Sequence, residues 1–191
     1  MTDVSLRERK RRRTRALLIE TGRRLFEERG YDRTTVADIA AAAEIGTRTF
    51  FVYFETKEQL LFPESDPRVT AALEAIRTRA AGETPAQVLL RGLDGAPIDD
   101  EAASPMAQLR LRLMAEVPAV QARAMRQQFA AQEQIVAALL DAYPELDDVE
   151  AAALVGAFIG AVAAAFQALG EQGDVAYRKR RVRAAVASAL S

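Results

Sequence analysis

The side chains that most enzymes use for covalent or metal chemistry are missing from this sequence. Its 191 residues include no His and no Cys. The lack of His removes the commonest general base and zinc ligand, and the lack of Cys excludes disulfides, thiolate ligands and thiol nucleophiles. Asp, Glu and Lys remain, but no carboxylate pair stands at metal-ligand spacing. We therefore expect a protein that is not an enzyme and that has no metal and no cofactor.

The residues with the clearest chemistry lie in one short segment, Thr47–Phe54. In a helix, Phe50 and Phe54 are four residues apart and share one buried face. The opposite face then exposes Phe51 and Val52 beside Thr47 and Arg48. Large apolar side chains make little sense on a solvated surface, whereas they suit the major groove of DNA, where they can touch thymine methyl groups.

Hydrogen-bond donors accompany this face. Arg48 can donate to the O6 and N7 atoms of guanine. Neighbouring polar groups and the Arg-rich N-terminus can reach phosphates, and the Arg run could also enter the minor groove. The candidate DNA-binding residues are Arg11, Arg12, Arg13, Thr35, Thr47, Arg48, Thr49, Phe51, Val52, Tyr53 and Lys57.

Charge is distributed unevenly along the chain, although the net charge is only −1. Residues 1–58 hold 13 Lys and Arg against 10 Asp and Glu, whereas residues 59–191 hold 13 against 17. A basic N-terminal third on an acidic body is typical of a DNA reader attached to a part that avoids DNA.

Local signals place Thr47–Phe54 in a helix-turn-helix. Helical periodicity begins at about Arg13, and Gly30 can end that helix by taking a left-handed conformation. The segment Thr35-Val36-Ala37-Asp38 predicts a capping box at the start of a second helix. A three-residue turn, Glu44-Ile45-Gly46, then leads into Thr47–Phe54, which is the spacing of a helix-turn-helix.

The rest of the chain also predicts helices. Thr56-Lys57-Glu58-Gln59 indicates another capping box that opens a fourth helix, which Pro63 and Pro67 interrupt before it runs on to about Ala80. No segment alternates with period two, so the predicted fold class is all-α, with an N-terminal three-helix domain and a larger C-terminal helical domain. Further helices are expected near Pro85–Leu93, Pro105–Glu116, Pro118–Tyr143, Asp147–Leu169 and Asp174–Leu190.

These patterns alone leave alternatives open. Helix-turn-helix spacing in an all-helical protein also arises from plain packing, and a basic N-terminus is often a solvated tail or a site for acidic lipid. The competing hypothesis is a helical protein-interaction module without ligand sensing.

Two longer segments resemble the opening of a TetR-family repressor. They are Leu25-Phe26-Glu27-Glu28-Arg29-Gly30-Tyr31-Asp32-Arg33-Thr34-Thr35-Val36-Ala37-Asp38-Ile39-Ala40 and Thr49-Phe50-Phe51-Val52-Tyr53-Phe54-Glu55-Thr56-Lys57-Glu58, within a match over residues 13–62. The resemblance implies a homodimer that regulates transcription, with a ligand pocket in the larger domain. We expect a disordered basic arm over residues 1–12, a helix-turn-helix DNA-binding domain over 13–58, and a ligand-binding and dimerisation domain over 59–191.

Several positions depart from the family pattern. Glu44 stands where the family usually has Gly, and Gly46 where it has Ser or a similar cap. Phe51 replaces a Tyr that often touches phosphate, so Tyr53, where many members have His, is expected to supply that contact. Val52 stands where basic residues are frequent, and the arginine arm is expected to compensate.

The segment Thr-Phe-Phe-Val-Tyr-Phe, after an Arg-rich tail, resembles one branch of the family that is common in actinobacteria. Some members of that branch respond to acyl-CoA-like ligands. The implied function is a repressor that an acyl-CoA-like or other apolar small molecule releases from a palindromic operator. Met and Phe suit an adaptable apolar cavity but suit a plain core equally well, and an Arg could pair with a ligand anion. The candidate ligand-binding residues are Met106, Leu109, Arg110, Leu113, Phe129 and Phe158.

Small residues recur every four positions in the segment Asp147–Leu169, which lets another helix approach closely. In the family, the last two helices of each subunit form a four-helix dimer bundle, whereas the pattern alone would also fit an intramolecular core helix. The candidate interface residues are Ala153, Gly156, Gly160, Ala164, Val182 and Val186.

The expected location is the cytoplasm, without membrane contact. The basic N-terminus precedes no long apolar run of the kind that a signal peptide needs. The most apolar segment, Val149–Leu169, is interrupted by Glu150 and Gln167 and consists largely of Ala and Gly, which predicts a buried helix rather than a membrane span.

Overall fold

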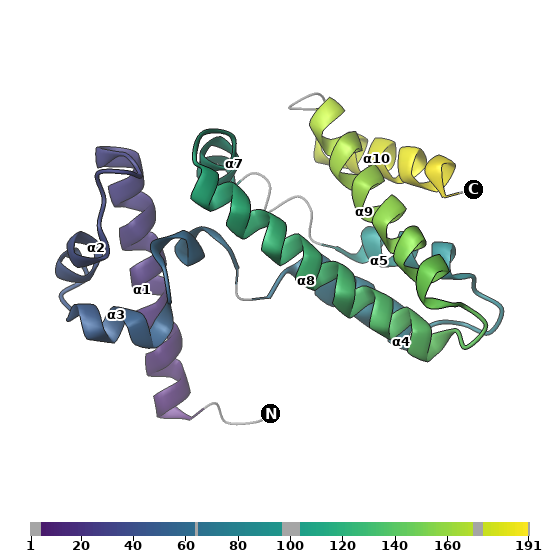
Figure 1. The fold of residues 1–191 in the computed structure, drawn as a ribbon, viewed down its shortest axis with the longest axis horizontal. Helices are drawn as coiled ribbons and strands as arrows, with labels where there is room; N and C mark the ends of the chain where they lie inside the picture. The colour runs from purple at the N-terminus through teal and green to yellow at the C-terminus, as the bar shows by residue number, and fades with distance from the viewer. Residues whose placement is uncertain (1–4, 64, 97–103, 170–173, 191) are drawn as a thin grey trace. The chain divides into compact units, whose positions relative to one another are not determined.

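The structure is a computed structural model that describes residues 5–63, 65–96, 104–169 and 174–190. Over these ranges all regular secondary structure is helical (Figure 1). The predicted all-α fold class is therefore confirmed. Most of the segment between the two helices expected near Pro85–Leu93 and Pro105–Glu116, residues 97–103, falls outside the described residues.

The chain forms two compact units. Over the described residues, the first unit contains 5–63 and 104–125, and the second contains 65–96, 126–169 and 174–190. This division differs from the one expected at residue 58, because residues 104–125 bury their apolar side chains in the core of the N-terminal helices.

The first helix, α1, spans Leu6–Arg29 and begins seven residues before the expected start. Ser5 caps it, because the Ser5 hydroxyl accepts a hydrogen bond from the Glu8 amide at 3.3 Å. Residues 6–12 are thus helical rather than a disordered arm. The helix ends at Gly30, whose φ of 84° is a backbone conformation that favours glycine.

Helix α2 spans Val36–Ala42 and opens with the predicted capping box. The Asp38 amide donates to the Thr35 hydroxyl at 3.1 Å, and the Thr35 amide donates to the Asp38 carboxylate at 2.8 Å. The Thr35 hydroxyl also donates to the Asp38 carboxylate at 2.5 Å. This bond, followed by the one from the Thr35 amide, holds the pKa of the Asp38 carboxyl below its usual value.

A Schellman motif ends α2 and aims the chain into α3, which spans Thr47–Tyr53. The Ile45 amide donates to the Ala40 carbonyl at 2.9 Å, and the Glu44 amide donates to the Ala41 carbonyl at 3.0 Å. Glu44 has a φ of 55°, in the left-handed region. Glycine adopts this backbone conformation with the least conformational strain, and the family usually has Gly at this position. Glu44 therefore carries strain that a glycine would not.

The predicted fourth helix does not begin at Thr56. That side chain makes no capping hydrogen bond, and the segment Lys57–Leu61 forms a short 3₁₀ helix, η1. The α-helix starts later: α4 spans Pro67–Arg77, with Pro67 in its first turn and the Asp66 carboxylate accepting from the Arg68 amide at 2.9 Å. The two prolines thus separate two elements rather than kink one.

The first unit packs around a single apolar core. Helix α7, Pro105–Glu116, and the first two turns of α8, Pro118–Ala142, contribute to it. Helix α1 approaches η1 closely at Gly22, where an added Cβ would lie 2.6 Å from the Leu60 side chain. The core includes Leu18, Leu25, Ile39, Phe50, Phe54, Leu60, Leu61, Leu109, Leu113 and Val120.

The second unit contains α4, α5 (Pro85–Gly95), the rest of α8, α9 (Asp148–Leu169) and α10 (Val175–Ala189). Helices α4 and α5 form an antiparallel pair, and α10 packs on both α9 and α5. Fully buried apolar side chains hold the unit together, among them Val88, Leu89, Leu139, Val155, Val182 and Val186.

Polar contacts brace one end of this unit. The Arg91 guanidinium binds the Glu83 carboxylate through two hydrogen bonds of 2.8 and 3.0 Å and also donates to the Ala75 carbonyl at 2.7 Å. The Tyr143 hydroxyl donates to the Glu83 carbonyl at 2.9 Å. The α4–α5 connection is therefore tied to both helices and to the end of α8.

Gly92 marks the closest approach of α4 and α5. A Cβ at this position would lie 2.9 Å from the Ala72 Cα, and a backbone atom cannot move aside. Gly92→Ala is expected to lower the free energy of unfolding by about 1–3 kcal/mol, measured by urea denaturation. Gly95→Ala, on the same helix with open space around it, is the matched control and should leave stability unchanged or raise it by up to about 1 kcal/mol. Equal stability of the two variants would contradict the packing described.

Glu44 provides a second test of the local structure. Glu44→Gly relieves the left-handed strain in the turn and is expected to raise the free energy of unfolding by about 1 kcal/mol. Ala41→Gly, in the regular helix just before it, is expected to cost about 1 kcal/mol instead. A destabilised Glu44→Gly variant would show that Glu44 does not hold this conformation in solution.

Candidate nucleic-acid interface

Helix α3 is oriented by two aromatic side chains. Phe50 and Phe54 are buried in the core of the first unit, with ring centroids 5.7 Å apart. The other face carries the side chains expected to face outward: Phe51 is 55% exposed and Val52 71% exposed. Thr47, Arg48 and Thr49 are also exposed. This face of α3 is therefore exposed and can contact a partner without repacking of the core.

Tyr53 is placed differently. It is half-buried and packs against the core of the first unit with Ile45 and Val36. Only its outer part is accessible, so any phosphate contact would come from the edge of the face and not from its centre.

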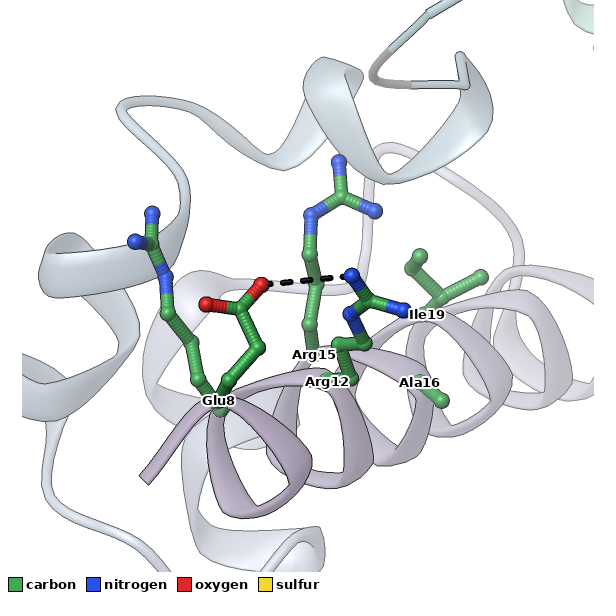
Figure 2. A pocket seen from close by; sticks show the side chains of 6 residues that line it. Glu8, Arg12, Arg15, Ala16 and Ile19 are labelled. Carbon is green, nitrogen blue, oxygen red and sulfur yellow. Dashed lines mark hydrogen bonds and ion pairs between the residues drawn. The ribbon is translucent and has the colours of Figure 1, made fainter. Parts of the chain in front are cut away.

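Arginines near the start of α1 lie on the surface of the same unit. Arg11, Arg12 and Arg15 line a surface hollow together with Glu8, Ala16 and Ile19 (Figure 2). The Arg12 guanidinium pairs with the Glu8 carboxylate at 3.3 Å, and Arg15 extends from the helix instead. Arg13 is exposed but does not line the hollow. Two of the predicted phosphate contacts, Arg11 and Arg12, therefore lie together at the hollow, whereas Arg13 lies elsewhere on the surface of α1.

Arg15 links this basic hollow to α3. Its guanidinium lies 4.8 Å from the centre of the Phe54 ring, a cation–π contact. Arg15 belongs to the Arg-rich run that is expected to follow the DNA backbone, but it is missing from the list of candidate residues. The signal was present: Ser5-Leu6-Arg7-Glu8 has the spacing of a capping box, and a helix from Leu6 puts Arg11 and Arg15 on one face.

Lys57 has a structural role in this unit. Its ammonium donates to the carbonyls of Tyr31 and Thr34 at 2.8 and 2.9 Å, and it lies 4.0 Å from the centre of the Tyr31 ring. The Thr34 hydroxyl, fully buried, donates to the Gly30 carbonyl at 2.8 Å. Lys57 therefore fastens η1 to the connection between α1 and α2, and its predicted phosphate contact would compete with these bonds.

Tyr31 and Glu58 complete the same anchor. The Tyr31 hydroxyl donates to the Glu58 carboxylate. Burial, followed by this hydrogen bond, raises the pKa of Tyr31 well above its usual value. Burial acts to raise the pKa of Glu58 as well, but hydrogen bonds from Thr56 and Tyr31 outweigh it and the net shift is downward. The phenol thus stays neutral and the carboxylate charged near neutral pH.

Thr35 is committed to its helix cap, since its hydroxyl accepts from the Asp38 amide and contacts the Asp38 carboxylate at 2.5 Å. Of the eleven candidate DNA-binding residues, the structure places five on the exposed face of α3 and three at the start of α1. Thr35, Tyr53 and Lys57 are the ones that it ties into the fold.

The six candidate ligand-binding residues fall into both units. Met106, Leu109 and Leu113 pack in the first core, and the Arg110 guanidinium donates to the Leu61 carbonyl at 3.2 Å. In the second unit, Phe158 is buried in the core and Phe129 is 60% exposed. Neither unit by itself gathers all six. Within the described ranges, no group of three or more acidic side chains could hold a metal ion.

The candidate interface residues also separate into two kinds. Ala153, Gly160 and Ala164 are exposed, whereas Gly156 is half-buried and faces α8, where an added Cβ would lie 3.7 Å from the Gln132 amide. Val182 and Val186 are fully buried inside the unit. A partner subunit cannot contact these two valines directly, because neither has any exposed surface. They can only hold α10 in place beneath an interface.

This arrangement, two short helices joined by a tight turn with the second helix turned outward, defines a helix-turn-helix regulator. Residues 18–62 match the sequence profile of bacterial regulatory proteins of the tetR family, and residues 84–189 match the MftR C-terminal domain. The chain belongs to the TetR family of transcriptional regulators. The family consists of DNA-binding regulators, which confirms the prediction that the chain is not an enzyme.

Two curated relatives are similar to part of this chain. The HTH-type transcriptional regulator TcmR of Streptomyces glaucescens is 41% identical over 114 residues, covering 56% of this chain and 50% of TcmR. The HTH-type transcriptional repressor DhaR of Mycobacterium sp. (strain GP1) is 49% identical over 41 residues, covering 22% of this chain and 21% of DhaR. The matches thus span half or less of these relatives.

Solved structures share the fold over almost the whole chain. FadR of Thermus thermophilus, a TetR-family repressor in complex with lauroyl-CoA, has a TM-score of 0.54 at 19% identity, covering 93% of this chain and 95% of its own. SmeT, the repressor of the Stenotrophomonas maltophilia efflux pump SmeDEF, has a TM-score of 0.55 at 16% identity, covering 92% and 88%.

A substitution at Lys57 can distinguish a structural role of this side chain from direct contact with DNA. Lys57→Met removes the charged donor from two carbonyls and is expected to lower the free energy of unfolding by about 1–3 kcal/mol. Arg48→Ala, an exposed substitution on the same unit, should change it by less than about 0.5 kcal/mol. Thermal and urea unfolding of both variants measure this difference. A Lys57→Met variant with wild-type stability and weakened DNA binding would assign Lys57 to phosphate instead.

Proposed function

We propose that this chain is a homodimeric repressor that reads a palindromic operator through α3 and is released by a small, largely apolar ligand. The observation that carries the DNA-reading half is the exposure of Phe51 and Val52 beside Arg48. Burial of Phe50 and Phe54 holds α3 in the rotation that exposes this face, so the exposure is determined by the core packing. A cytoplasmic location follows from the proposal, because the operator lies there.

Contacts with DNA divide into two kinds. Arg48 at the exposed face is suited to guanine, and the neighbouring Phe51 and Val52 to thymine methyl groups. Arg11 and Arg15, beside their surface hollow, are suited to phosphate oxygens, which position the protein without reading sequence. In a two-fold dimer the two α3 helices would enter major grooves about one helical turn apart, ~34–36 Å.

A second subunit is supported by the surface of α9. The segment Asp148–Ala165 has a mean hydropathy of 1.7, and only 17% of it is buried. It is the one described helix that is long and apolar enough to cross a membrane by length and composition. Its exposed positions include Ala153, Gly160 and Ala164, and small residues of this kind let a second helix pack closely.

The proposed effector is an acyl-CoA-like or other apolar molecule. FadR, which shares this fold, is described in complex with lauroyl-CoA. Release would require the ligand to bind the DNA-free conformation more tightly than the DNA-bound one. A ligand that binds tightly without changing operator affinity would contradict this part of the proposal.

Selection from random DNA duplexes, followed by titration of the selected operator across a salt series, tests the DNA-reading half. Arg48→Ala is expected to weaken specific binding by about 1–3 kcal/mol per half-site and to relax the base preference at one position. Arg11→Ala is expected to weaken binding to all sequences and to reduce the salt slope by about 1 for each phosphate that is no longer neutralised.

The control is Arg24→Ala. Arg24 is exposed on α1, the helix that carries Arg11 and Arg15. It lies nine residues from Arg15 and therefore on the opposite side of α1. Its guanidinium pairs with the Glu28 carboxylate at 3.2 Å. It should leave operator binding unchanged. Undiminished specific binding by Arg48→Ala would show that α3 is not the reading helix, and failure of the wild type to select any sequence at low salt would favour a protein-interaction module.

A further inference from the structure

The exposed face of α3 divides along the helix into a polar part and an apolar part. Thr47, Arg48 and Thr49 are exposed in its first turn, and Phe51 and Val52 are exposed in its second. Arg48 and Val52 are four residues apart and therefore lie on the same side of α3. Exposed donors thus come from the first turn, whereas Phe51 and Val52 present only carbon and hydrogen.

Both apolar side chains are held in place. The Phe51 ring stands edge-on to the ring of the buried Phe50, with centroids 5.6 Å apart and an angle of 83° between the rings. Val52 is β-branched, and a helix leaves such a side chain one strongly preferred rotamer. Little side-chain entropy is therefore lost when these two residues are covered, which favours contact with a small apolar group.

The major groove of DNA offers one apolar group of this size. Base edges there present hydrogen-bond donors and acceptors, and the only carbon substituent among the four bases is the methyl group on C5 of thymine. Phe and Val side chains neither donate nor accept hydrogen bonds, so they cannot pair with O4 of thymine or with the N4 amino group of cytosine. They can detect a C5 methyl group through the apolar area that it removes from water.

Cytosine that is methylated on C5 carries the same group at the same position of the ring. We propose that α3 reads the C5 methyl group itself, so that 5-methylcytosine replaces thymine in this contact and cytosine methylation there strengthens binding. The inference rests on the proposed DNA-reading function of α3 and adds the chemical group that Phe51 and Val52 recognise.

The length of α3 places this contact relative to the guanine. From Arg48 to Val52 the helix rises ~6 Å, and successive base pairs are ~3.4 Å apart. For a helix that lies along the groove, the methyl group is therefore expected about two base pairs from the guanine that Arg48 contacts.

Removal of single methyl groups from the selected operator tests the contact. Each thymine is replaced in turn, in both half-sites, by deoxyuridine, which lacks only the C5 methyl group. Fluorescence anisotropy measures the dissociation constant of the full-length chain at fixed salt. At the contacted thymine, deoxyuridine is expected to weaken binding roughly fourfold per half-site, the change that follows from leaving one carbon group uncovered.

The same position is then tested as a C·G pair. Operators with cytosine or 5-methylcytosine at this position have guanine opposite in both cases and differ only in the methyl group. 5-Methylcytosine is expected to bind roughly fourfold more tightly than cytosine per half-site, the same ratio as thymine to deoxyuridine. Each ratio is taken within one kind of base pair, so the opposite purine does not affect it.

Substitutions in α3 assign the two ratios to side chains. Phe51→Ala and Val52→Ala are each expected to lower both ratios, and the double variant to bring both near one. Arg48→Ala is the matched control, because it weakens binding from the same face but should keep both ratios. Salt is lowered until every variant binds measurably. Circular dichroism and thermal unfolding follow the fold, since Phe51 also contacts Phe50.

The two ratios separate the possible outcomes. Two similar ratios well above one, lost together in the double variant, support methyl reading by α3. Ratios of one with specific binding retained overturn the inference and leave the proposed reading helix intact. A preference for thymine over deoxyuridine without one for 5-methylcytosine, or a preference that survives in the double variant, also overturns it. A wild-type chain that selects no operator overturns the proposed function and the inference together.

Discussion

Burial of Phe50 and Phe54 is the constraint on which the DNA-reading face depends. A seven-residue helix such as α3 has little stability of its own, because most helical stability in proteins comes from packing an apolar face. Two aromatic rings four residues apart fix both the position of α3 and its rotation about its own axis. The exposure of Arg48 and its neighbours is a consequence of that burial, so the reading face is only as rigid as the core beneath it.

The polar contacts around this core hold the segments on either side of α3. The turn before it is closed by the Schellman hydrogen bonds of Ile45 and Glu44, and the segment after it is fastened by Lys57 and Glu58. Both anchors reach back to backbone or to Tyr31, away from the exposed face of α3. The structure thus separates groups that hold the helix from groups that are free to meet DNA, and this separation explains why Lys57 packs inward and Arg48 does not.

Features that depend on neighbours in sequence were predictable, and those that depend on tertiary packing were not. The capping box at Thr35 and the end of α1 at Gly30 follow from local hydrogen bonding and backbone freedom. The same four-residue pattern at Thr56 failed, because Leu60, Leu61 and Phe62 are all buried and consecutive residues of an α-helix cannot share one face. The contacts of Lys57 join residues 23 and 26 positions apart, and no local signal announces them.

Helix α9 shows how composition alone misleads about burial. Its sequence predicts a buried helix, yet the structure buries only one side, where Ala151, Val155 and Phe158 face the core. After the first turn, the exposed positions that the structure describes are all Ala or Gly. A lipid-facing helix gains most from large side chains, because transfer free energy grows with apolar area, whereas a helix that packs closely on another gains from small ones. The distribution of residue sizes around α9, rather than its mean hydropathy, therefore favours a second helix as the covering surface.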